Sequence, residues 1–264
     1  MNRQRLCPEL WQLGDTGPAG AARTFVFAPF GGGSAYAVAE WAGELVRPGE
    51  AAVALQYPGR GPRHLEPNAT DLPRLAGQCA AAIHDCCPGP LVLVGHSLGG
   101  VLCYEIALAL DDLGADVELL AASAARAPDD QRLDAGTVLA MSRDDWLAEV
   151  ASGGHLAVSD AELADVADLM IPVLRADYLL LARYAPAGWR PVRAGLLALG
   201  GRDDPWVTPA HLAGWSRWTT GPFGSLMLDG GHFYYRDRLD AFGRAIRERL
   251  TPARNHLAGA ERTR

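Results

Sequence analysis

The sequence contains no lysine, so its 24 basic residues are all arginine, and 31 acidic residues leave a net charge of −7. This excess of acid argues against general binding to nucleic acid or to anionic membranes, because both attract basic surfaces. The chain also lacks an apolar run long enough to span a bilayer, and its first residues, MNRQRLCPEL, lack the apolar core of a signal peptide. We therefore expect a cytoplasmic protein that does not associate with membranes.

Cysteine is scarce and irregularly placed. There are five cysteines, an odd number without the spacing of metal ligands, and most lie in apolar stretches. Such residues are typical of reduced packing cysteines in a cytosolic protein. We expect neither a disulfide framework nor a metal site.

Apolar residues, in contrast, are abundant. At 264 residues and 49% hydrophobic content it can bury a large core, and it suits one α/β domain with an insertion. For a chain organised in this way we expect a monomer.

Short apolar runs alternate with amphipathic segments along most of the sequence. This alternation predicts an α/β fold with a mostly parallel sheet that helices cover on both faces. The predicted strands span 24–30, 51–57, 90–97, 117–123, 195–199 and 225–228, and the predicted helices span 35–46, 72–86, 98–113, 209–218 and 238–250.

The alternation breaks in one region, where helical patterns at 134–152, 159–169 and 172–184 follow one another without strands. We interpret residues 128–189 as a helical lid inserted into a core formed by 1–127 and 190–250. Ligands of open α/β sheets bind at the carboxyl ends of the strands, so such a lid would cover the site. A purely structural subdomain is the alternative. Residues 251–264 are polar, and we expect a disordered tail.

The sequence LVLVGHSLGG, residues 91–100, indicates a nucleophile elbow. An apolar strand runs into Gly-His-Ser-Leu-Gly and then into a helix, which is the context this motif requires. Ser97 lies at the apex, at a helix N-terminus where backbone N–H groups can receive an oxyanion. Glycines in a tight turn without chemistry are the alternative interpretation.

A serine nucleophile needs a histidine base and an acid that orients it, in the chain order serine, acid, histidine. Only His232, in the Gly-Gly-His loop after the last predicted strand, follows the expected pattern. The acid should follow the strand at 195–199, where Asp203 and Asp204 are adjacent. We prefer Asp204 because Pro205 stiffens the turn after it, although spacing alone does not decide between the two carboxylates.

A second donor for the oxyanion is expected after an early strand, where FVFAPFGGGSAY supplies three glycines. We pair the backbone N–H of Gly31, or as an alternative that of Phe30, with the N–H of Leu98. A phosphate-binding loop is the competing interpretation, but the run lacks a P-loop lysine and the G-x-G-x-x-G spacing.

Several strings together carry a family resemblance: APFGGGSAY (28–36), QYPGRGPR (56–63), GHSLGG (95–100), LMIPVLRADYLLLARY (169–184), LGGRDDPWV (199–207) and LDGGHFYY (228–235). With them the chain resembles, over nearly its whole length, the discrete type II thioesterases of nonribosomal peptide and polyketide biosynthesis. The resemblance implies an α/β-hydrolase fold and the triad Ser97, Asp204 and His232. One position departs from the family pattern, because Phe30-Gly31 stands where histidine and alanine are usual.

The resemblance also implies a substrate and a partner. The family hydrolyses stalled or aberrant acyl groups from the phosphopantetheine arm of acyl or peptidyl carrier proteins, with no metal or bound cofactor. Carrier proteins present an acidic helix, so an acidic enzyme needs a local basic patch to meet it. The candidate residues are Arg60, Arg63, Arg126, Arg175 and Arg183.

Three other functions stay open. A general carboxylesterase or lipase would use the same triad, and only the strings around Arg60 and Asp177 argue against it. An acyltransferase usually continues GHSxGE, whereas this chain has Gly100. A carrier-binding module without activity would need neither a nucleophile nor a base.

Overall fold

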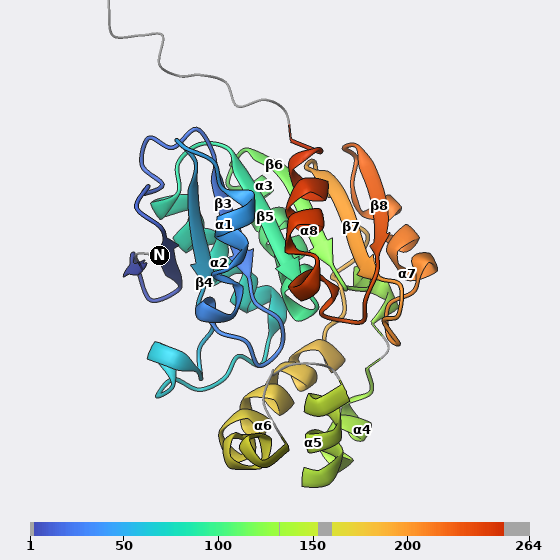
Figure 1. The fold of residues 1–264 in the computed structure, drawn as a ribbon. Helices are drawn as coiled ribbons and strands as arrows, with labels where there is room; N and C mark the ends of the chain where they lie inside the picture. Colours follow the sequence, from blue (N-terminus) through green and yellow to red (C-terminus); the bar gives the residue numbers. More distant parts are fainter. Residues whose placement is uncertain (1–2, 132, 153–159, 251–264) are drawn as a thin grey trace, which may run out of the picture.

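The computed structural model describes residues 3–131, 133–152 and 160–250, and it contains an eight-stranded sheet (Figure 1). The strand order is β1-β2-β4-β3-β5-β6-β7-β8, and every pairing from β4 to β8 is parallel. The predicted α/β class with a mostly parallel sheet is confirmed. The strands are β1 (Arg3–Arg5), β2 (Leu10–Leu13), β3 (Thr24–Ala28), β4 (Ala51–Leu55), β5 (Leu91–His96), β6 (Val117–Ser123), β7 (Gly195–Gly201) and β8 (Phe223–Leu228).

The three central strands β3, β4 and β5 are buried at every position. Their near-continuous apolar sequence is what a parallel strand needs when helices cover both of its faces. Sequence analysis missed the N-terminal hairpin, in which β1 pairs antiparallel with β2 and β2 with β4. These strands have only three and four residues, and β1 is exposed throughout, so neither produces a long apolar run.

Helices cover the sheet on both faces, as predicted. On one face α2 (Leu72–Cys86) and α3 (Leu98–Asp112) build one core, and on the other α1 (Trp41–Leu45) and α8 (Leu239–Arg247) build a second (Figure 1). Two predicted helices that flank the sheet are each divided in two. Residues 35–46 form the 3-10 helix η1 (Ala35–Val38) followed by α1, and residues 209–218 form α7 (Pro209–Ala213) followed by η4 (Gly214–Trp218).

Helices α4 (Ala135–Ala140), α5 (Arg143–Ser152) and α6 (Asp160–Ala182) lie between β6 and β7 in the chain, and they pack together at one end of the sheet (Figure 1). The predicted helix at 134–152 is in fact two helices. The predictions at 159–169 and 172–184 were wrong in the opposite sense, because α6 continues through Pro172. A proline inside a helix removes one backbone donor, and here the remaining hydrogen bonds carry the helix past it. The expected tail at 251–264 lies outside the described residues.

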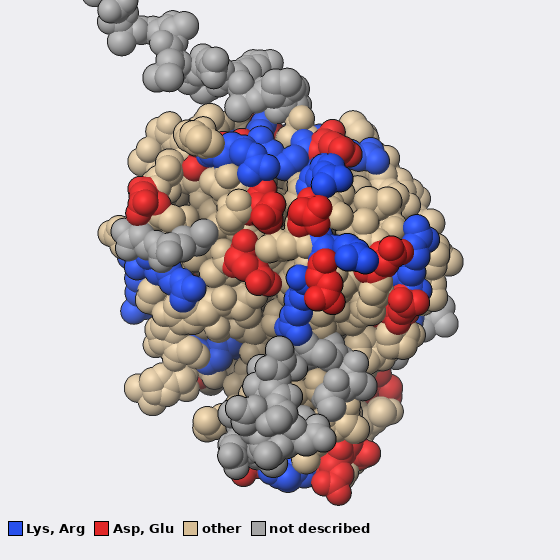
Figure 2. All heavy atoms as spheres, in the orientation of Figure 1, with Lys and Arg blue, Asp and Glu red and all other residues tan. Residues whose placement is uncertain are grey.

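No helix among the described residues combines the length and the apolar composition that crossing a bilayer requires. They also hold no group of three or more His, Cys, Asp or Glu side chains placed to bind a metal ion. All five cysteines are described, and all are free thiols. On the face drawn in Figure 2, basic and acidic side chains are interspersed.

Candidate active site

Ser97 lies at the turn between β5 and α3, in a backbone conformation that side chains other than glycine rarely adopt. Its φ is 54° and its ψ is −118°. A Cβ on Gly95 would lie 2.0 Å from the carbonyl oxygen of Gly99, and a Cβ on Gly99 would lie 2.2 Å from that of Ala28. Only glycine fits at these two positions, so the local sequence imposes the sharp turn that places Ser97 at its apex.

The N-terminus of α3 begins immediately after Ser97, and the serine side chain makes no capping hydrogen bond to it. The first N–H groups of a helix have no partner inside the helix. Leu98 is the first residue of α3, so its N–H is one of these groups, and it follows Ser97 directly in the chain.

His232 and Asp204 form a hydrogen-bonded pair. Nδ1 of His232 lies 2.8 Å from Oδ2 of Asp204, and the other carboxylate oxygen, Oδ1, accepts hydrogen bonds from the N–H groups of Trp206 at 2.8 Å and Val207 at 3.2 Å. The Asp204 side chain is fully buried, whereas the neighbouring Asp203 is exposed. The structure thus brings Asp204, and not Asp203, to His232.

The His232 ring also lies close to the elbow. Its centroid is 5.0 Å from that of His96, which precedes Ser97, and 4.8 Å from that of Trp206. These neighbouring rings limit the rotation of the imidazole, and the hydrogen bond to Asp204 sets which nitrogen carries the proton.

A buried polar chain lies behind this arrangement. Nδ1 of His96 is 2.9 Å from Oγ of Ser123, and that oxygen is 2.7 Å from the Tyr234 hydroxyl. The carbonyl oxygen of Ser123 also accepts the N–H of Ser97 at 2.7 Å. Burial raises the pKa of the Tyr234 hydroxyl well above its usual range, so this group stays protonated and can donate. Sequence reasoning missed Ser123 and Tyr234, since neither belongs to a recognisable pattern.

Residues 29–33, which we call the glycine loop, follow β3 and lie next to the elbow. The N–H of Gly33 donates to the carbonyl oxygen of Phe30 at 2.9 Å, and the N–H of Gly32 donates to Oδ2 of Asp177 at 2.7 Å. Gly32 has a φ of +79°, which glycine adopts without strain. Within the described part of the chain, the N–H of Gly31 makes no hydrogen bond, so it is the one amide of these three that remains available to a ligand.

Phe30, which departs from the family pattern, is buried beside the same site. Its ring centroid lies 4.7 Å from that of Phe233 and 6.1 Å from that of His96, edge to face in both cases. The guanidinium carbon of Arg236 lies 4.2 Å from the Phe233 ring centroid. An apolar ring therefore occupies this position and packs the glycine loop against the loop that carries His232.

Two of the five arginines proposed for carrier contact are corrected by the structure. Arg60 is buried and forms a bidentate ion pair with Asp177. Arg63 is also buried, and its guanidinium group pairs with Glu66 and donates to the carbonyl oxygen of Gln56. Both guanidinium groups are largely buried and already paired with carboxylates of their own chain, which argues against a role in binding the acidic helix of a partner.

The other three arginines are more accessible. Arg183 is exposed and Arg175 is half-buried, with Nη2 of Arg175 donating to the carbonyl oxygen of Leu139 at 3.0 Å. Arg126 is half-buried and donates to the carbonyl oxygen of Trp206, the residue whose ring faces His232. These three remain candidates for carrier contact.

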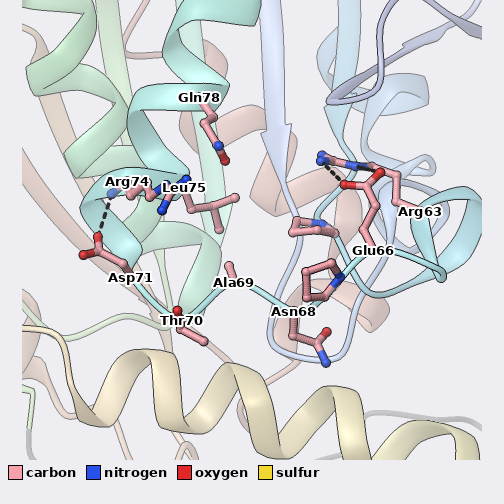
Figure 3. Close-up of a pocket in the computed structure, with 11 residues that line it drawn as sticks. Arg63, Glu66, Asn68, Ala69, Thr70, Asp71, Arg74, Leu75 and Gln78 are labelled. Carbon is pink, nitrogen blue, oxygen red and sulfur yellow. Dashed lines mark hydrogen bonds and ion pairs between the residues drawn. The ribbon is translucent and has the colours of Figure 1, made fainter.

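A pocket of about 360 Å³ lies between the loop after β4 and the start of α2 (Figure 3). Charged and polar side chains line much of it, among them Arg63, Glu66, Asp71, Arg74 and Gln78. Arg63 and Glu66 pair with each other on one side of the hollow, and Asp71 caps α2 on the other side. None of the triad candidates lines this pocket.

Residues 23–250 match the model of the thioesterase domain family. A probable cadicidin biosynthesis thioesterase of Streptomyces griseus is 35% identical over 207 residues, which cover 78% of this chain and 57% of that protein. The chain therefore spans just over half the length of this curated relative.

Solved structures agree with the sequence comparison. The type II thioesterase BorB of the borrelidin biosynthetic cluster superposes with a TM-score of 0.82 at 31% identity, covering 94% of this chain and all of that one. RedJ, a thioesterase of the prodiginine pathway of Streptomyces coelicolor, superposes with a TM-score of 0.75 at 32% identity, covering 86% and 92%. The chain belongs to the thioesterase domain family and has the α/β-hydrolase fold predicted from its sequence.

Proposed function

We propose that this protein is a type II thioesterase that hydrolyses acyl groups from the phosphopantetheine arm of carrier proteins in nonribosomal peptide or polyketide biosynthesis. Its role would be to remove stalled or aberrant chains. The observation that carries the proposal is the His232–Asp204 hydrogen bond of 2.8 Å beside the strained elbow at Ser97. The names of BorB and RedJ, which place them in biosynthetic pathways, support the substrate class.

In the proposed first step, Nε2 of His232 takes the proton of the Ser97 hydroxyl as Oγ attacks the thioester carbonyl carbon. Asp204 stabilises the imidazolium that forms, through its hydrogen bond to Nδ1. The tetrahedral intermediate collapses with cleavage of the C–S bond, and the imidazolium returns its proton to the departing sulfur. The carrier leaves with a free thiol, and the acyl group remains on Ser97 as an oxygen ester.

In the second step, His232 takes a proton from water as the water attacks the ester carbonyl. Collapse of this intermediate breaks the bond to Oγ, Ser97 regains its proton, and the acyl group leaves as a carboxylic acid. The N–H groups of Leu98 and Gly31 would stabilise the oxyanion in both steps, each contributing on the order of 3 kcal/mol. All of these steps use protein groups and water, so we propose that no metal or cofactor takes part.

The helical insertion α4–α6 would form the lid of the acyl chamber. Its own small core includes Val138, Trp146, Val150 and Leu174, all of them buried. Trp146 and Tyr178 pack edge to face with centroids 5.3 Å apart. Side chains buried in this way mainly hold the lid together, and the half-buried apolar residues around them, such as Met141 and Met170, are the better candidates for contact with an acyl chain.

Arg126, Arg175 and Arg183 are the proposed contacts for the acidic helix of a carrier protein. Arg126 is linked to the base through Trp206, because it donates to the backbone carbonyl of Trp206 and the ring of Trp206 packs against His232. We also propose that the protein works as a monomer in the cytoplasm, and its five free thiols suit a reducing compartment.

The proposal is tested by hydrolysis of a panel of acyl carrier and peptidyl carrier proteins, with acyl groups from acetyl to long chain. The matching N-acetylcysteamine thioesters and simple oxygen esters are assayed beside them, with Ser97→Ala as the control. We expect carrier-bound thioesters to be cleaved much faster than the small analogues, and Ser97→Ala to be inactive. Faster cleavage of oxygen esters would indicate a general esterase instead, transfer without hydrolysis an acyltransferase, and carrier binding without turnover a binding module.

A further inference from the structure

The segment that follows β4 holds the first residue of the glycine loop and the start of η1, two residues after the loop. The Tyr57 hydroxyl donates to the carbonyl oxygen of Pro29 at 2.8 Å, and Oε1 of Gln56 accepts the N–H of Ala35 at 3.2 Å. Tyr57 and Gln56 are both buried. The backbone on either side of the glycines therefore depends on hydrogen bonds from another part of the chain.

The middle of the loop is held from the insertion. Asp177 on α6 accepts the N–H of Gly32 and is ion-paired on both of its oxygens with Arg60, the Nη2–Oδ1 distance being 2.7 Å. Asp177 is 2% and Arg60 6% exposed. Charge-assisted bonds in a buried setting are short and directional, so this carboxylate is fixed in place from two sides.

The two peptide groups on either side of Gly31 are both held by hydrogen bonds. The peptide that carries the Gly31 N–H also carries the Phe30 carbonyl, which accepts the N–H of Gly33. The next peptide carries the Gly32 N–H, which donates to Asp177. Glycine residues have the widest backbone freedom, so without these hydrogen bonds the direction of the Gly31 N–H would vary.

Helix α6 also packs directly on this residue. A Cβ on Gly31 would lie 3.6 Å from Cβ of Asp177, 3.7 Å from Cδ1 of Leu174 and 3.9 Å from Cε2 of Tyr178. The helix that is expected to cover the substrate is thus in contact with the loop that is expected to hold the oxyanion.

We propose that Asp177, held by Arg60, is a positioning residue that aims the Gly31 N–H at the oxyanion of the tetrahedral intermediates. The proposal rests on the function proposed above. Asp177 does not touch the substrate in this role, and it acts through the backbone of the glycine loop. The insertion therefore contributes to the chemical step as well as to the substrate chamber, and the docked position of α6 is a condition for a complete oxyanion hole.

The chain offers a closely matched control at the opposite ends of the strands. Glu50, just before β4, is 4% exposed, accepts the N–H of Arg47 at 2.9 Å and pairs with the buried Arg23 at 3.2 Å. Like Asp177 it is buried, ion-paired and bonded to a backbone N–H, with a second ion pair to Arg247 at 2.5 Å, but it lies far from Ser97 in the fold. Glu50→Gln therefore measures what the loss of such a carboxylate does to stability alone.

The experiment compares Asp177→Asn with Glu50→Gln in the full chain. Steady-state kinetics are measured with an acyl carrier protein, and hydrogen–deuterium exchange is measured over residues 29–35. We expect Asp177→Asn to lower kcat about 10- to 100-fold with little change in KM. Removal of one oxyanion donor lowers kcat about 10²- to 10³-fold, and a donor that is present but misdirected should lower it less. Glu50→Gln should retain kcat within about twofold at a similar loss of Tm.

Hydrogen–deuterium exchange tests the positioning role of Asp177 separately from the proposed thioesterase activity. We expect faster exchange at residues 29–35 in Asp177→Asn alone, a result that does not depend on activity. Unchanged exchange in Asp177→Asn, or a loss of kcat no larger than that in Glu50→Gln, would overturn the positioning role. An inactive wild type would refute the thioesterase proposal, and the exchange comparison would still decide whether Asp177 orders the loop.

A second variant covers the case in which Asp177→Asn does not fold. Arg60→Lys keeps the positive charge but loses the planar fork that contacts both carboxylate oxygens. We expect a smaller fall in kcat, about threefold to tenfold, together with intermediate exchange at residues 29–35. Wild-type kcat and exchange in a folded Arg60→Lys protein would contradict the proposal.

Discussion

Nδ1 of His232 lies 2.8 Å from Oδ2 of Asp204, although the two residues come from loops after different strands. Two backbone N–H groups hold the other oxygen of the same carboxylate, so Asp204 is oriented before any substrate arrives. Asp203, one position earlier, is exposed.

This difference predicts opposite outcomes for two adjacent substitutions. Asp204→Asn should lower kcat by about 10³- to 10⁴-fold, because an amide cannot stabilise the imidazolium and favours the wrong tautomer. Asp203→Asn is the matched control and should retain kcat within about twofold. Steady-state assays with a carrier-bound thioester distinguish the two, and equal losses would contradict the assignment.

The backbone strain at Ser97 predicts a gain in stability when the side chain is removed altogether. At a φ of 54° a residue with a Cβ is strained, whereas glycine is not. Ser97→Gly and Ser97→Ala should both be inactive, but the glycine variant should have a free energy of unfolding about 1 kcal/mol higher than the alanine variant. Urea titrations measure this, and an alanine variant as stable as the glycine variant would show that the turn is not strained.

Two helical glycines should respond with opposite sign to the same substitution. A Cβ on Gly99 would meet backbone oxygen at 2.2 Å, so Gly99→Ala should lower the free energy of unfolding by about 3 kcal/mol and reduce activity. A Cβ on Gly77, in α2, would meet no described atom within 4 Å apart from the adjoining backbone of its own helix, so Gly77→Ala should raise the free energy of unfolding by about 0.5–1 kcal/mol. Thermal unfolding of both variants measures these changes in stability. A Gly77→Ala protein less stable than wild type would contradict the prediction.

The buried thiols predict a loss of stability at alkaline pH. Burial raises the pKa of Cys79 and of Cys87 to about 12, from 9.0. In the unfolded chain these thiols ionise first, so raising the pH from about 9 to 12 favours unfolding, by on the order of 1 kcal/mol per thiol and pH unit. Other buried groups with raised pKa values, such as Tyr57, act in the same direction.

The measurement is the free energy of unfolding between about pH 8 and pH 11, in wild type and in the double variant Cys79→Ala and Cys87→Ala. The double variant should be less stable at the lower pH but should lose less stability as the pH rises. Parallel pH dependences of the two proteins would show that these thiols do not contribute.

Much of the fold could be predicted from local sequence. The strand β6 and the helix α2 have the predicted bounds, because an apolar run or a helical apolar stripe ended by a cap is a local signal. The divided helices and the continuous α6 were not predicted, because helix ends are decided partly by tertiary packing. The short β1 was missed because its three exposed residues are ordered by pairing with β2.

The sequence by itself determined the elbow at Ser97 and the class of fold, and it limited the acid to Asp203 or Asp204. Each of these follows from a pattern of contiguous residues. Tertiary structure decided that Asp204 faces His232, and it turned Arg60 inward to Asp177, 117 residues away. It also joined Asp177 to Gly32 across 145 residues. The physical reason is that hydrophobic periodicity and turn preferences depend on residues close together in the sequence. The direction of a buried charged side chain depends instead on which partner, often distant in the sequence, compensates its charge.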